Sequence, residues 1–179
     1  MQAIRLETAR LVIREFRDGD WEAFDGYSAD PAAARAWAGP VTPESTRRAV
    51  DDALAIQQRL PRNRFHLAVE VRSSGELIGD VEVSRLPGER EAELSVILAA
   101  AARGRGYGTE LAVAMARWAR DTLGMERVVG YCEPGNAASR RVLEKAGFVL
   151  ERMWTRPPGD PAGEKWPEAC VYLFAPPSR

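Results

Sequence analysis

A short glycine-rich segment, residues 103–109, constrains the fold of this chain more than any other part of the sequence. Its glycines stand at alternate positions, so the backbone can approach a ligand closely with few side chains in the way. A long amphipathic helix is expected to follow, and the free N–H groups and dipole at its start favour an anion. The segment therefore predicts a pyrophosphate-binding loop made of Arg103, Gly104, Arg105, Gly106, Tyr107, Gly108 and Thr109.

Two other kinds of phosphate-binding loop have different spacings. Dinucleotide-binding folds space their glycines as GxGxxG, whereas the glycines here follow GxGxG. A P-loop carries a lysine and a hydroxyl residue after its last glycine, but Thr109 follows Gly108 directly, without a lysine. Taken alone, the segment is equally compatible with a flexible connector whose arginines are solvated.

The order of apolar patterns predicts a mixed α/β protein with a single domain, residues 1–179. Asp20 and Thr42 are expected to cap two early helices, with a short helical stretch starting at Asp30 between them. Two later helices are expected at residues 108–123 and 136–146. Strands are expected near residues 11–16, 65–72, 77–83, 92–98, 127–132, 148–154 and 169–174.

Charge and composition exclude several classes of function. Lys and Arg number 25 against 26 Asp and Glu, so no basic excess indicates a nucleic-acid partner. The single histidine, His66, and two cysteines without CxxC spacing, Cys132 and Cys170, predict no metal site and two buried, reduced thiols. No apolar run reaches the roughly 18 residues of a membrane span, and the first residues lack a signal core. We therefore expect a soluble, cytoplasmic protein.

Four segments resemble, in the same order, the motifs of one enzyme family. Residues 103–108 follow the pattern Arg-x-x-Gly-x-Gly between a strand and a helix. Residues 136–148 read Asn-Ala-Ala-Ser-Arg-Arg-Val-Leu-Glu-Lys-Ala-Gly-Phe, and residues 6–14 and 92–95 resemble an opening strand and the start of a fourth strand. Together they resemble the GNAT superfamily of N-acetyltransferases, in its RimJ/RimL-like branch of ribosomal-protein N-terminal acetyltransferases.

The resemblance implies a GNAT fold, which is a central mixed, mostly antiparallel seven-stranded sheet flanked by helices and splayed at the acyl-CoA site. It also implies acetyl-CoA as the acyl donor, with its pyrophosphate on residues 103–109. In this family the pantetheine arm pairs with the main chain of the preceding strand end, here Val96, Ile97 and Leu98.

The segment beginning at Asn136 is implied to complete the cofactor site. In the family, the matching asparagine contacts the pantetheine arm. The residue matching Ser139 lies near the thiol sulfur and protonates the leaving thiolate, and Tyr131 is an alternative acid. Capping at the start of a helix explains Asn136 and Ser139 equally well without any contact to a cofactor.

An amine nucleophile must lose a proton before or during its attack on a thioester, so a base or a water chain is needed. Glu93 matches a family glutamate and is the candidate base, although a solvated strand end explains it equally well. The other candidates are Glu82, Glu168 and His66, of which the histidine also suits a structural role in a strand. We expect direct transfer in a ternary complex.

The acceptor amine is the least constrained part of the interpretation. In this branch the acceptor binds between the early helices and the last strands. The aromatic residues of this chain in those regions are Trp21, Phe24, Tyr27, Trp37, Trp154 and Trp166. They are expected to line a pocket, but they are equally typical of a core rich in aromatic residues. The sequence departs from the pattern of this branch in three places. Val96 replaces a common aromatic residue, Ala100-Ala101-Ala102 replaces a Pro-Glu-aromatic stretch, and the loop 156–167 is longer and richer in proline than usual. The sequence is compatible with either a protein N-terminus or a small-molecule amine as the acceptor. It is also compatible with a homodimer. The alternative function is a CoA-binding regulator without turnover.

Overall fold

The structure is a computed structural model that describes residues 3–34, 40–86, 90–155 and 167–175. Contacts within the chain define two compact units. Unit 1 comprises Met1–Glu82 and Val96–Leu111, and unit 2 comprises Val83–Ser95 and Ala112–Arg179. Each unit therefore combines segments that lie apart in the sequence, and the single domain 1–179 stays a prediction.

The described chain contains β1 (Arg5–Glu7), β2 (Leu11–Glu15), α1 (Trp21–Ser28), α2 (Pro31–Ala34), α3 (Pro43–Ile56), β3 (Arg64–Val71), β4 (Leu77–Arg85), β5 (Glu91–Leu98), α4 (Tyr107–Asp121), β6 (Arg127–Cys132), α5 (Ala137–Lys145), β7 (Phe148–Thr155) and β8 (Glu168–Phe174). Short 3-10 helices span Asp18–Asp20 and Ala100–Ala102. None of the helices in the described ranges is long and apolar enough to cross a membrane.

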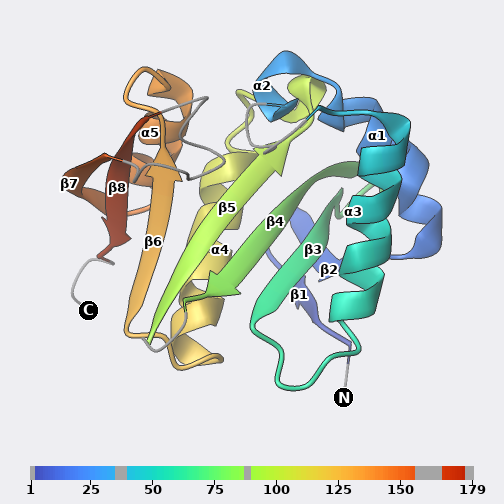
Figure 1. Ribbon diagram of the computed structural model, residues 1–179, viewed down its shortest axis with the longest axis horizontal. Coiled ribbons are helices and arrows are strands. Elements are labelled where there is room, and N and C mark those ends of the chain that lie inside the picture. Colours follow the sequence, from blue (N-terminus) through green and yellow to red (C-terminus); the bar gives the residue numbers. More distant parts are fainter. Residues whose placement is uncertain (1–2, 35–39, 87–89, 156–166, 176–179) are drawn as a thin grey trace. The chain divides into compact units, whose positions relative to one another are not determined.

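The strands form one sheet in the order β1-β2-β3-β4-β5-β6-β8-β7 (Figure 1). Pairing is antiparallel between β1 and β2, β2 and β3, β6 and β8, and β7 and β8, and it is parallel between β5 and β6. The predicted mixed α/β class is confirmed. The predicted number of seven strands is wrong, because the sheet has eight. The additional strand, β1, has three residues, which is too short for an alternating pattern to reveal it.

Unit 1 has its apolar core between the sheet and two helices. Helix α3 begins as predicted, with the Thr42 hydroxyl accepting a hydrogen bond from the Ser45 backbone N–H at 3.2 Å and Pro43 at the first position. It packs against α1 and β3 (Figure 1). The core cluster consists of Phe16, Phe24, Tyr27, Val50, Ala53 and Ala68.

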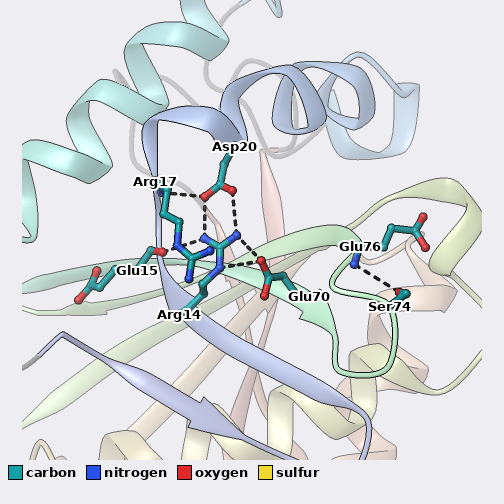
Figure 2. A network of polar contacts seen from close by, with 7 residues as sticks. All are labelled: Arg14, Glu15, Arg17, Asp20, Glu70, Ser74 and Glu76. Atoms are coloured by element: carbon teal, nitrogen blue, oxygen red, sulfur yellow. Dashed lines mark hydrogen bonds and ion pairs between the residues drawn. The ribbon is translucent and has the colours of Figure 1, made fainter.

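Asp20 does not cap α1 with its side chain, contrary to the prediction, because it ends the 3-10 helix Asp18–Asp20 with helical φ and ψ, and its carboxylate accepts hydrogen bonds from Arg14 and from the Arg17 backbone N–H. Arg14 donates hydrogen bonds to both carboxylate oxygens of Asp20, at 2.7 and 2.8 Å, and also contacts Glu70 (Figure 2). The hydrogen bonds to Asp20, and then those to Glu70, raise the pKa of the Arg14 guanidinium despite its burial. A buried guanidinium must be paired, and Asp20 and Glu70 supply its counter-charges.

Unit 2 packs α5 against strands β6, β7 and β8. A Cβ atom at Gly130 on β6 would lie 2.9 Å from Leu143 Cδ2, so glycine lets the helix approach the sheet closely. The Tyr172 hydroxyl on β8 donates to Glu144 Oε1 at 2.8 Å. The helix ends as predicted at Gly147, whose φ of +89° lies in the left-handed region that favours glycine.

Candidate cofactor and catalytic residues

The predicted anion-binding loop lies in unit 1, directly before helix α4. Gly104 has a φ of +77° and Gly106 a φ of +81°, so both occupy the left-handed region that glycine adopts at little cost. A Cβ atom at Gly106 would also lie 3.3 Å from Arg10 Nη2. Gly104 and Gly106 are therefore required by the backbone path of the loop, which leads into the N-terminus of a 15-residue helix.

The two arginines of the loop have different surroundings. Arg103 donates to the Leu98 carbonyl oxygen at 3.0 Å and forms an ion pair with Asp30 at 2.6 Å. The hydrogen bond from Arg103 is the main cause that lowers the pKa of Asp30. Arg105 is exposed, and its side chain has no hydrogen bond or ion pair to any residue that the structure describes. Arg105 is thus the more available cation for an anionic ligand, whereas Arg103 braces the loop.

A clamp formed by Arg10 and Glu110, which sequence reasoning did not find, holds the loop in place. Arg10 donates through Nη1 to the Arg105 carbonyl oxygen at 2.8 Å and through Nε to Glu110 Oε2 at 2.7 Å. The Arg10 guanidinium also lies 4.7 Å from the centre of the Tyr107 ring. Burial opposes ionisation of Glu110, but hydrogen bonds from Thr8 and Arg10 outweigh it and lower the pKa of this carboxyl.

The end of β5, predicted to hold the pantetheine arm, is fixed against β4. The Ala99 N–H donates to the Ile78 carbonyl oxygen at 2.8 Å. A Cβ atom at Gly79 would lie 2.2 Å from the Ile97 carbonyl oxygen, so only glycine permits this close approach. The side chain of Ile97 packs against the core cluster of unit 1, which agrees with the prediction that it is a simple core residue.

Asn136, Ser139 and Glu93 belong to unit 2. Asn136 precedes α5, and its Oδ1 accepts a hydrogen bond from the Ser139 backbone N–H at 3.1 Å, so the predicted capping role is confirmed. The Ser139 hydroxyl is half-buried and has no hydrogen-bond partner within the described part of the chain. Glu93 is half-buried on β5 opposite Val129 of β6.

The alternative bases are engaged elsewhere or lie on the surface. His66 Nε2 is 3.0 Å from Asp80 Oδ2, and both residues are buried, so the histidine has the structural role that its place in a strand suggests. Glu82 forms an ion pair with Arg64 at 2.6 Å. Glu168 is exposed at the start of β8.

The aromatic residues considered for the acceptor pocket are divided between the two units. In unit 1, Phe24 and Tyr27 are buried core residues and Trp21 packs against their cluster. In unit 2, the rings of Trp154 and the alternative acid Tyr131 lie 5.7 Å apart. Trp37 and Trp166 lie outside the described residues.

Comparison with known proteins matches residues 10–149 to the model of the acetyltransferase (GNAT) domain. YnaD, an uncharacterized N-acetyltransferase of Bacillus subtilis (strain 168), is 25% identical over 171 residues, which cover 96% of each protein. A GNAT-family acetyltransferase from Bacillus anthracis is similar in structure, with a TM-score of 0.80 and 25% identity over 95% of this chain and 97% of that one.

Mycobacterium smegmatis RimJ, solved in complex with CoA-disulfide, has the same fold, with a TM-score of 0.72. The match covers 96% of this chain and 85% of that one, and its 17% identity shows the fold alone. The family model, in contrast, spans the loop 103–109 and the helix start at Asn136. The chain therefore belongs to the GNAT acetyltransferase family and is an acyl-CoA-dependent N-acetyltransferase.

Proposed function

We propose that this chain transfers an acetyl group from acetyl-CoA to a primary amine, by direct attack of the amine on the thioester in a ternary complex. The loop 103–109 carries the proposal. Its left-handed glycines expose backbone N–H groups at the start of α4, beside the exposed Arg105, whose side chain pairs with none of the described residues. A pyrophosphate is the part of CoA that suits such an array of donors and positive charge.

Acetyl-CoA supplies an activated thioester when it is bound, and the chain then has to position it. Pantetheine carries two amides and can pair like a short strand, so the main chain of residues 96–98 is the proposed partner. A backbone N–H group in the same stretch would stabilise negative charge that develops on the carbonyl oxygen. Glu93 is the proposed base that accepts the proton of the amine.

Asn136→Ser separates capping from cofactor binding, because serine caps helices about as well as asparagine but lacks the amide. We expect an unchanged free energy of unfolding and a rise in the KM for acetyl-CoA of about tenfold, which corresponds to one lost hydrogen bond. Asn136→Ala should additionally destabilise the protein by about 1 kcal/mol. If the serine variant kept the wild-type KM, Asn136 would be a cap and nothing more.

Ser139→Ala tests the proposed acid. A thiolate is a good leaving group, with a thiol pKa near 8.5 in model compounds, so its protonation contributes only modestly. We expect kcat to fall by about tenfold while KM for acetyl-CoA changes little. Tyr131→Phe is the matched variant for the alternative acid. A loss of kcat in Tyr131→Phe with none in Ser139→Ala would transfer the role to the tyrosine.

The activity itself is tested by thiol release from acetyl-CoA over a panel of amines. The panel contains a polyamine, free amino acids, an aminoglycoside and a peptide with a free N-terminus, each paired with its N-acetylated form as a control. We expect at least one free amine to accelerate release, with intersecting initial-rate lines when both substrates are varied. Parallel lines would indicate a covalent acetyl-enzyme instead. CoA binding without accelerated release by any amine would favour the non-catalytic regulator.

A further inference from the structure

Three sulfur-containing residues occupy one row across three neighbouring strands of unit 2. Cys132 on β6 is the register partner of Cys170 on β8, and Cys170 is in turn the partner of Met153 on β7. Register partners in antiparallel strands point to the same face of the sheet. The Cys170 Sγ and Met153 Sδ atoms are 3.6 Å apart. The pairing of β6, β8 and β7 thus gathers two thiols and one thioether, which we call the sulfur row.

The sulfur row lies on the face of the sheet that α5 covers. Tyr172, two positions along β8 from Cys170, points to this face because its hydroxyl contacts Arg140 and Glu144 of α5. Cys132 and Cys170 are only 5% and 2% exposed, which confirms that both are buried, whereas Met153 is 52% exposed. Met153 is therefore the member of the row that reaches the surface (Figure 1 shows the three strands beside α5).

We propose that the sulfur row binds one soft monovalent metal ion, Cu(I), through the sulfur atoms of Cys132, Cys170 and Met153. Soft thiolate and thioether ligands favour Cu(I), zinc and iron–sulfur clusters over hard cations, and an iron–sulfur cluster is usually held by four cysteines. Directly opposite residues in a sheet have Cβ atoms about 4.5–5.5 Å apart, which lets two sulfurs share one ion. This site is independent of acetyl transfer.

The ligand types favour Cu(I) over zinc. Two thiolates and one Cu(I) leave a single negative charge, which the Arg140 guanidinium stabilises and the Glu144 carboxylate destabilises. Zinc, in contrast, prefers four N, O or S ligands of the Cys, His, Asp and Glu type. Within the described ranges, no group of three such residues is placed to hold a metal ion.

Binding must displace the thiol protons. Burial is the main cause that raises the pKa of the Cys132 thiol to about 12, with Cys170 adding to it. The reaction is Cys132–SH plus Cys170–SH plus Cu(I), giving the bis-thiolate complex and two free protons.

The test is an anaerobic titration of the reduced full chain with Cu(I) supplied as its bicinchoninate complex. We expect one Cu(I) per chain, release of two protons, and an X-ray absorption spectrum with sulfur neighbours only. Cys132→Ala and Cys170→Ala should each weaken binding by at least about 100-fold, since even outer-shell partners cost about 10–100-fold. Met153→Leu should weaken it by about tenfold, while Met125→Leu serves as the matched methionine control.

Thermal unfolding of each metal-free variant shows whether it folds. Met153 is half-exposed, so Met153→Leu should fold even if a cysteine variant does not. The proposal is overturned if the chain takes no Cu(I) from bicinchoninate. It is also overturned if Met153→Leu binds as tightly as Met125→Leu, or if a chain lacking both thiols retains the affinity.

Discussion

Replacing Gly104 and Gly106 together by valine is expected to weaken CoA binding by about 100-fold. Both glycines have positive φ, which costs an ordinary residue about 1–2 kcal/mol each, and branched side chains would obstruct the approach of a phosphate to the backbone. Isothermal calorimetry with CoA measures the change.

Gly75→Val is the matched control for the glycine variants. Gly75 has a φ of +71° in the turn between β3 and β4, and a Cβ atom there meets no other atom within 4 Å. This variant carries the backbone strain of one of the two loop substitutions, at a position far along the chain from the loop, so it should lose stability but bind CoA as the wild type does. Equal loss of CoA affinity in both variants would show that strain, not the loop, causes the effect.

Replacing Arg14 by methionine is expected to destabilise the protein by about 3–5 kcal/mol, because it leaves Asp20 and Glu70 without their buried counter-charge. The Arg14 side chain is 6% exposed, so water cannot replace the guanidinium. Urea unfolding followed by circular dichroism gives the free energy.

Arg47→Met is the control for the Arg14 variant. Arg47 also has two carboxylate partners, Asp18 and Asp51, but its side chain is 41% exposed. Exposed ion pairs contribute little to stability, so this variant should unfold close to the wild type. If Arg14→Met unfolded at the same urea concentration as Arg47→Met, the network in Figure 2 would have no special role in stability.

Local sequence patterns were sufficient for most of the fold. The Thr42-Pro43 helix start, the Gly147 helix end and the loop 103–109 depend on the conformation of a few consecutive residues. The prediction for Asp20 is wrong because this residue ends a 3-10 helix and pairs with Arg14, and only the folded chain shows these two contacts.

The parts that the sequence did not reveal depend on contacts between distant segments. The clamp joins Arg10 to Glu110, and the sulfur row joins Cys132 to Met153 through Cys170. The position of Glu110, an acid in the first turn of a helix, is a weak indication that this residue matters at the loop. Nothing in the adjacent sequence indicates that its partner is Arg10. Pairing of strands brought the cysteines together, although no CxxC spacing marks them.

Binding of the CoA pyrophosphate by residues 103–109 is tested by comparing CoA with pantetheine, which lacks the pyrophosphate and the nucleotide attached to it. The wild type should bind CoA far more tightly than pantetheine, and neither ATP nor NAD should stabilise it as CoA does. In the Gly104→Val/Gly106→Val variant the advantage of CoA over pantetheine should largely disappear. An undiminished advantage in that variant, or stabilisation of the wild type by ATP but not by CoA, would contradict the account.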